Sequence, residues 1–226
     1  MQKERYTLVA DFAVQGDLAY LSHQETLTLF QRAFIRAAVP LMYSSGFNPH
    51  PHVSIPFPRS VGTCSDGDRV TATVEFETVP ANEQLSERVQ QQLPTDCRLL
   101  GLHCVPGKQT FLPASVRYQF MLNDVLTPTQ QAHLGMCKGQ IDHDEAIHIQ
   151  RYRAKKKRYQ TFDISPFVQS LDIQSDCIEV VCSVTQGGTV RVDELMQWLA
   201  IDINRLREPV KRTDIVWDQN KTTFND

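Results

Sequence analysis

The sequence has no long apolar run, and this absence excludes one class of protein. None of its hydrophobic stretches approaches the roughly 18 residues that a membrane-spanning helix requires. Residues 1–6 also lack the apolar middle region that a secretory signal places after its basic residues. We therefore expect the protein to be cytoplasmic.

Motifs that hold metals, cofactors or reactive nucleophiles are missing as well. The six cysteines are scattered, and the closest pair, Cys177 and Cys182, is too widely spaced for a CxxC zinc motif. The sequence contains no Walker loop, no dinucleotide-binding glycine pattern and no GxSxG nucleophile elbow. We expect six reduced thiols and no bound metal or cofactor.

The chain also lacks an excess of charge of either sign. Its net charge is −3, with 41% hydrophobic and 22% charged residues among 226, which is ordinary for a globular protein. A small negative charge argues against a protein that coats nucleic acid indiscriminately, but it leaves room for a local basic patch. The length allows one large domain or two small ones.

The first half contains a recognisable succession of elements. Residues 5–15 alternate apolar with polar or small side chains, which indicates a strand. Ser22 and Glu25 have the capping-box spacing, which predicts a helix that ends before Pro40. The remaining expected elements are extended segments at 53–57 and 69–78, a turn at 64–68 between them, a helix with Leu85, Val89 and Leu93 on one face, and a strand at 98–105.

The second half repeats this succession. Thr127 and Gln130 form another capping box, with Pro128 at the first helical position. The other expected elements are strands at 116–122, 147–153, 159–164, 177–185 and 210–217 and a helix over 192–199. We therefore predict an α+β protein with two tandem ferredoxin-like (βαββαβ) halves, residues 1–108 and 114–220, of which the second carries an extra basic hairpin.

The segment SSGFNPHP at residues 44–51 is rich in residues that restrict the backbone. Gly46 permits positive φ, whereas the two prolines fix φ and restrict the residues before them. Such a loop holds one shape. It would display Phe47 as a stacking surface and Asn48 and His50 as hydrogen-bonding groups. The alternative is a rigid turn in which Asn48 caps the backbone of the loop itself.

Two histidines near this loop are candidates for acid–base chemistry. His23, at the start of the first helix, or His50, in the loop, could act as a general acid or base. With His52, Asp66 and Asp68 they could also form a metal site. The HxH spacing is common by chance, however, and no other metal motif supports it, so we expect no metal.

Two groups of cations are candidates for phosphate binding. Arg32 and Arg36 lie one turn apart on the polar face of the first helix and could converge on a phosphate with Ser44, Ser45 and His50. The second group lies in the basic hairpin, where tyrosines flank and interrupt six cations, which are Arg151, Arg153, Lys155, Lys156, Lys157 and Arg158. Such a cluster is typical of a phosphate-backbone contact with stacking surfaces. In both cases a solvated, exposed surface is the alternative.

Several segments together resemble one known family. In the first half these are YLSH at 20–23, QRAFIRAAVP at 31–40, YSSGFNPHP at 43–51, VSIPFP at 53–58 and VGTCS at 61–65. In the second half they are DISPFV at 163–168 and GTVRVDEL at 188–195. Over nearly its whole length the chain resembles the radical SAM-linked family, also called domain of unknown function 2344.

The resemblance implies a partner rather than a reaction. It implies an accessory or substrate-presenting subunit of a radical SAM system, with a radical SAM protein as partner and RNA as the substrate class. The chain lacks the closely spaced cysteines that hold a radical SAM cluster, so it is not itself the iron–sulfur enzyme. Glu25 stands where the family usually has aspartate, which weakens any role for a carboxylate there.

Three functions follow from these observations. The first is an RNA-binding accessory protein without chemistry of its own. The second is a metal-independent RNA-processing enzyme that uses His23 or His50, by analogy with the tandem ferredoxin-like endonucleases that cleave CRISPR repeats. The third is a protein–protein docking module that binds no nucleic acid. We expect a binding protein rather than an enzyme, and no association with a membrane.

Overall fold

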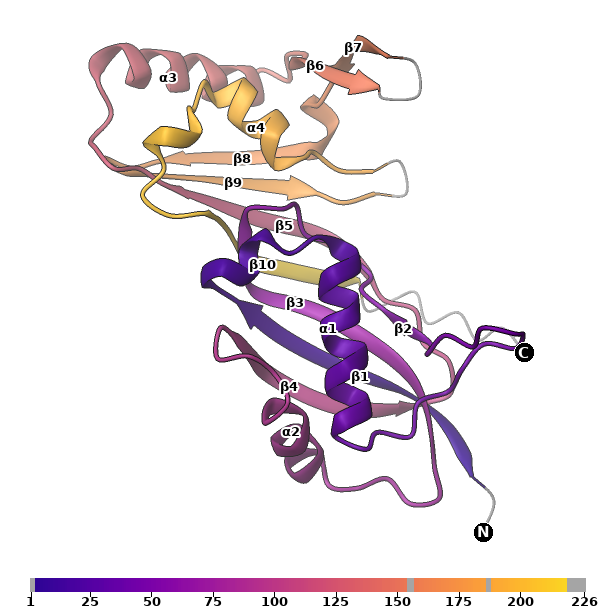
Figure 1. The fold of residues 1–226 in the computed structure, drawn as a ribbon. Coiled ribbons are helices and arrows are strands. Elements are labelled where there is room, and N and C mark those ends of the chain that lie inside the picture. The colour runs from indigo at the N-terminus through magenta and orange to yellow at the C-terminus, as the bar shows by residue number, and fades with distance from the viewer. Residues whose placement is uncertain (1–2, 154–156, 186–187, 219–226) are drawn as a thin grey trace. The chain divides into compact units, whose positions relative to one another are not determined.

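The computed structural model describes residues 3–153, 157–185 and 188–218, and it confirms the α+β class (Figure 1). The chain forms two compact units. The first comprises Met1–Pro113 with Trp217–Asp226, and the second comprises Ala114–Val216. No helix in the described part of the chain combines the length and the apolar character needed to span a membrane.

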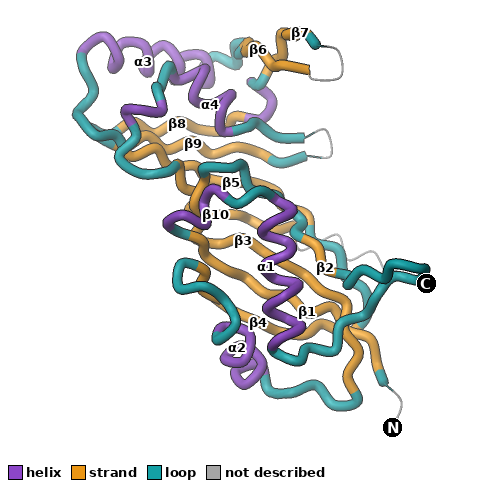
Figure 2. Tube along the Cα trace, viewed as in Figure 1, coloured by secondary structure: helices purple, strands orange, loops and turns teal. Residues whose placement is uncertain are grey.

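The first unit is an antiparallel sheet with two helices on one face (Figure 2). Its strands are β1 (Glu4–Val14), β2 (Val53–Ser54), β3 (Thr63–Phe76) and β4 (Cys97–Pro106). They lie in the order β4-β1-β3-β2. A 3-10 helix, η1 (Gly16–Tyr20), leads into α1 (His23–Arg36), and α2 (Asn82–Gln90) precedes β4.

The core of this unit lies between the sheet and α1. Leu8, Ala10 and Phe12 are alternate residues of β1, so their side chains share one face, and all three are fully buried. Phe30 of α1 packs its ring 4.4 Å from that of Phe12, centroid to centroid, and 5.9 Å from that of Phe34. This aromatic cluster secures α1 against the sheet and thereby positions the loop that follows the helix.

The turn predicted at residues 64–68 is wrong, because these residues belong to β3. Phe12 pairs with Asp68 and Val14 pairs with Ser65, so Asp66 and Gly67 of β3 together oppose one residue of β1. The turn-like composition is therefore accommodated as a β-bulge, which inserts an extra residue without ending the strand. Strand pairing outweighed the local turn preference.

The second unit also contains strands and helices. Its strands are β8 (Val168–Ile173), β9 (Cys177–Ser183) and the larger parts of β5 (Leu112–Met121) and β10 (Val210–Asp218). They lie in the order β10-β5-β9-β8, and the β5–β9 and β8–β9 pairs are antiparallel. Its helices are α3 (Pro128–Asp142) and α4 (Val192–Leu199), with short 3-10 helices η3 (Ser165–Phe167) and η4 (Ile203–Arg205). Strand β8 was not expected from the sequence.

The basic hairpin lies between α3 and β8. It consists of β6 (His148–Arg153) and β7 (Arg158–Asp163), which pair antiparallel as a two-stranded sheet of their own. Ile149 is buried at its base. The predicted contact residues Lys155 and Lys156 lie outside the described residues.

Candidate nucleic-acid interface

The loop at residues 44–51 is closed at its neck by Ser44. The backbone N–H of Ser44 donates to the His50 carbonyl at 2.9 Å, and the backbone N–H of His50 donates to the Ser44 hydroxyl at 3.0 Å. Tyr43 and Pro51 form an isolated β-bridge just outside this neck. Gly46 has φ of 126°, which favours glycine at the tip. The closing hydrogen bonds thus come from Ser44 and His50 rather than from Asn48.

Side chains at the tip of this loop face solvent. Phe47 is fully exposed, at 107% of its reference accessibility. Ser45, Asn48 and His50 are exposed as well. An aromatic ring held outward on a closed loop is unfavourable in water by itself, and it is typical of a surface that stacks on a ligand or partner.

The candidate residues of α1 are exposed but not joined to the loop. His23 is the first residue of α1, and Arg32 and Arg36 lie further along the helix. Among the described residues, no hydrogen bond or ion pair links these three side chains to one another or to His50. His23 and His50 therefore remain separate candidates for a general acid or base.

The β6–β7 hairpin carries its tyrosines and its arginines on opposite faces. Tyr152 pairs with Tyr159 and Arg153 with Arg158, and successive side chains of a strand alternate between faces. The two tyrosine rings lie 5.3 Å apart, centroid to centroid, and are 52% and 69% exposed. Within the described part of the chain, neither Arg153 nor Arg158 takes part in an ion pair.

Arg151, which was predicted as a phosphate contact, is instead paired with a carboxylate of the protein. Its guanidinium bonds both carboxylate oxygens of Glu194 in α4, with Nη2 2.8 Å from Oε2. The two side chains are 11% and 3% exposed, and the guanidinium stacks 3.9 Å from the centroid of Phe162. Arg151 therefore anchors the hairpin to α4, and we leave it out of the contact set proposed below. Sequence reasoning missed Glu194.

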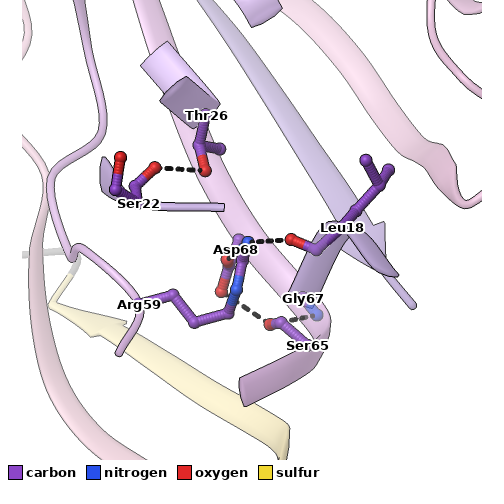
Figure 3. A network of polar contacts seen from close by, with 7 residues as sticks. All are labelled: Leu18, Ser22, Thr26, Arg59, Ser65, Gly67 and Asp68. Atoms are coloured by element: carbon purple, nitrogen blue, oxygen red, sulfur yellow. Dashed lines mark hydrogen bonds and ion pairs between the residues drawn. The ribbon is translucent and has the colours of Figure 1, made fainter. Parts of the chain in front are cut away.

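Asp68, considered above as a metal ligand, is held in the interior of the first unit instead (Figure 3). Its carboxylate accepts from Arg59 Nη1 at 2.6 Å and from the Ser65 hydroxyl at 2.6 Å. Arg59 Nη2 also donates to the Leu18 carbonyl at 3.3 Å. In the described part of the chain, no group of three or more His, Cys, Asp or Glu residues is placed to hold a metal ion.

Comparison with known proteins identifies the family of the chain. The model of the DUF2344 family, described as an uncharacterized protein conserved in bacteria, matches residues 7–192. The chain belongs to the DUF2344 family. The matched residues include the loop at 44–51 and the whole β6–β7 hairpin, so both candidate elements lie within the DUF2344 region. None of the curated proteins matches the chain.

None of the six cysteines of this DUF2344 protein forms a disulfide, and we expect these thiols to react slowly in the native state. Burial raises the pKa of Cys97 and of Cys182 to about 12. Because the thiolate is the reactive form, on the order of one molecule in ten thousand is reactive at each position at pH 8. Labelling with iodoacetamide and peptide mass spectrometry should show modification of the half-buried Cys104 first.

The same labelling in urea, where all six thiols should react, serves as the control. Native labelling of Cys97 as fast as that of Cys104 would contradict the buried placement of Cys97.

Proposed function

We propose that this protein binds RNA through the β6–β7 hairpin and the loop at residues 44–51, without chemistry of its own. The observation that carries the proposal is the opposition of Arg153 and Arg158 across the hairpin. Like charges directly opposite in a β-ladder destabilise it, and no carboxylate in the described residues neutralises this pair. Phosphate oxygens would supply the missing negative charge.

Exposed aromatic rings support the same proposal. Tyr152 and Tyr159 form a solvent-exposed ring pair on the hairpin face opposite Arg153 and Arg158. Phe47 lies exposed at the tip of the loop. Proteins that recognise single-stranded RNA stack its bases on such rings. Arg32 and Arg36 of α1 and the loop side chains of Ser44, Ser45, Asn48 and His50 complete the proposed contact set.

We further propose that the protein is a cytoplasmic accessory or substrate-presenting subunit of a radical SAM system. The resemblance at residues 31–40 and 43–51 supports this role, because it lies in the segments that build α1 and the loop. The absence of disulfides among these six cysteines agrees with a reducing compartment. The partner would supply the iron–sulfur chemistry, and this chain would hold the RNA.

We also propose that each unit is a ferredoxin-like βαββαβ module. The strand orders β4-β1-β3-β2 and β10-β5-β9-β8 support this interpretation, since each places the first and third strands of its unit side by side at the centre. In the first unit the second strand is reduced to Val53–Ser54. In the second unit the β6–β7 hairpin is an insertion between the first helix and the second strand.

The test of RNA binding is its dependence on salt. Replacing Arg153, Lys157 and Arg158 by glutamine should lower RNA affinity and reduce the slope of log affinity against log salt by about 0.7 to 0.9 for each lost phosphate contact. Fluorescence anisotropy with a labelled RNA, measured at several salt concentrations, gives both quantities.

The matched control removes the same charge elsewhere. Arg5, Arg98 and Lys138 are exposed, and their replacement by glutamine should leave the salt slope nearly unchanged. Equal losses in the two triple variants would show that net charge alone sets binding, and the proposed role of the hairpin would then be wrong.

A further inference from the structure

A groove in the second unit lies at the root of the hairpin. Its volume is about 710 Å³, and it is bounded by α3, the first residues of β6 and the end of α4. We call it the α3 groove, and the lining residues that matter below are His133, Met136, Gln140, His143, Gln197 and Trp198. His148, Ile149 and Gln150 belong both to its wall and to β6, so the groove and the hairpin are continuous.

Backbone carbonyls fix the tautomers of two histidines in the groove. His143 Nδ1 lies 2.8 Å from the Gly139 carbonyl, and His133 Nε2 lies 3.0 Å from the Trp198 carbonyl. A carbonyl oxygen can only accept, so each of these nitrogens carries the proton. In the neutral ring the other nitrogen of each histidine is therefore a hydrogen-bond acceptor.

Two glutamines that line the groove use their side-chain oxygens as acceptors, whereas the two histidines use a ring N–H as a donor. Gln140 Oε1 accepts from the Trp198 indole N–H at 2.9 Å, and Gln197 Oε1 accepts from the backbone N–H of Gln150 at 3.0 Å. With each amide oxygen engaged, the NH₂ group of each glutamine remains as a donor. The groove thus offers directed donors and directed acceptors together.

The charged residues of the groove disfavour a phosphate as its occupant. Among the described residues that line it there is no lysine or arginine, and the carboxylate of Glu145 repels anions. Met136 contributes an apolar surface that is 65% exposed. A neutral ring with both donors and acceptors on its edge fits these features, and the nucleobases are such rings.

We propose that the α3 groove binds an unpaired nucleobase of the RNA that the hairpin holds, an inference that rests on the proposed function. The groove begins at Gln150, and Arg153 lies roughly 10 Å further along β6. A single RNA strand can therefore place a base in the groove while its neighbouring phosphates meet Arg153 and Arg158. A fully paired duplex would first have to unpair and unstack a base, at a cost of roughly a few kcal/mol.

The experiment compares two RNAs with the same number of phosphates, a stem with an unpaired loop and a continuous duplex, each binding to the full chain. Met136→Glu places a carboxylate in the groove at an exposed position that the fold tolerates. It should weaken binding of the looped RNA about tenfold, the scale of a lost base contact, and leave duplex binding within about twofold. Lys138→Gln makes the same charge change at an exposed α3 position outside the groove and should affect both RNAs alike.

The outcomes distinguish failure of base binding in the α3 groove from failure of RNA binding by the protein. If wild-type protein binds the looped RNA but Met136→Glu behaves like Lys138→Gln, the groove does not bind a base, although RNA binding stands. If wild-type protein binds neither RNA, the proposed function fails and this inference fails with it. Fluorescence of 2-aminopurine at the unpaired position should change on binding wild-type protein and change little with Met136→Glu; equal changes would overturn the groove assignment.

Discussion

Replacing Arg59 with leucine is expected to destabilise the protein by about 3–5 kcal/mol, the usual cost of removing one partner from a buried ion pair. Arg59 and Asp68 approach to 2.6 Å, with side chains only 4% and 1% exposed. The variant leaves a buried carboxylate that has lost this cation. Since a domain is typically stable by about 5–15 kcal/mol, the loss should shift the urea unfolding midpoint strongly.

Two further variants show whether the ion pair is the cause. The double variant Arg59→Leu with Asp68→Leu removes both charges and should recover part of the loss, because no uncompensated charge then remains buried. The recovery is partial because the Ser65 hydroxyl, which donates to Asp68 at 2.6 Å, loses its acceptor. Arg207 and Asp176 form an exposed pair at 3.5 Å, and Arg207→Leu should cost about 0–1 kcal/mol. A cost for Arg59→Leu as small as that of the exposed pair would refute the prediction.

Replacing Glu194 with glutamine is expected to cost about 3–5 kcal/mol and to weaken RNA binding as well. Glu194 holds the guanidinium of Arg151 and also accepts from the backbone N–H of Arg191 at 3.0 Å, so the change affects both the hairpin and the start of α4. The net charge becomes more positive by one, which by itself would favour RNA. A fall in affinity would therefore report a displaced hairpin.

The neighbouring residue provides a charge-matched control. Asp193 is exposed in the first turn of α4, and Asp193→Asn makes the same charge change without touching Arg151. It should leave stability nearly unchanged and RNA affinity equal or slightly higher. Urea unfolding and anisotropy measure the two effects, and limited proteolysis should cut the hairpin faster in Glu194→Gln alone. Identical behaviour of the two variants would contradict the anchoring role.

Features set by local interactions could be predicted from the sequence. The capping boxes of α1 and α3 are confirmed, with Ser22 and Thr127 each donating its backbone N–H to the side chain three residues on, at 2.8 and 3.0 Å. These hydrogen bonds join residues within one helical turn, so short sequence motifs encode them. The start of a helix is therefore readable without knowledge of its tertiary neighbours.

Strand β8 illustrates why other parts could not be predicted. Val168 and Leu171 are buried although they are three positions apart, which breaks the two-residue alternation of a regular strand. The register of β8 against β9 shifts between Val168 and Ser170, and this irregularity returns the next apolar side chain to the core. The alternation that marks a strand in a sequence is lost wherever such a shift occurs.

Ion pairs between segments distant in the sequence are a second feature that could not be predicted. Arg151 and Glu194 are 43 positions apart, and no sequence motif at either position predicts the other as its partner. From the sequence Arg151 was indistinguishable from the other hairpin cations, because only the packing of β6 against α4 separates an anchoring arginine from an exposed one. The basic character of the hairpin could be predicted, but which of its cations anchors it to α4 could not.

The closed neck of the loop at residues 44–51 has a consequence for the thermodynamics of recognition. Its paired backbone groups at Ser44 and His50 are ordered during folding, so a partner does not have to order them on arrival. Phe47 has two side-chain torsions, and immobilising its ring costs little conformational entropy. At the proposed contact, preorganisation of the tip is therefore expected to lower the entropic cost of binding, so that a small contact area can suffice.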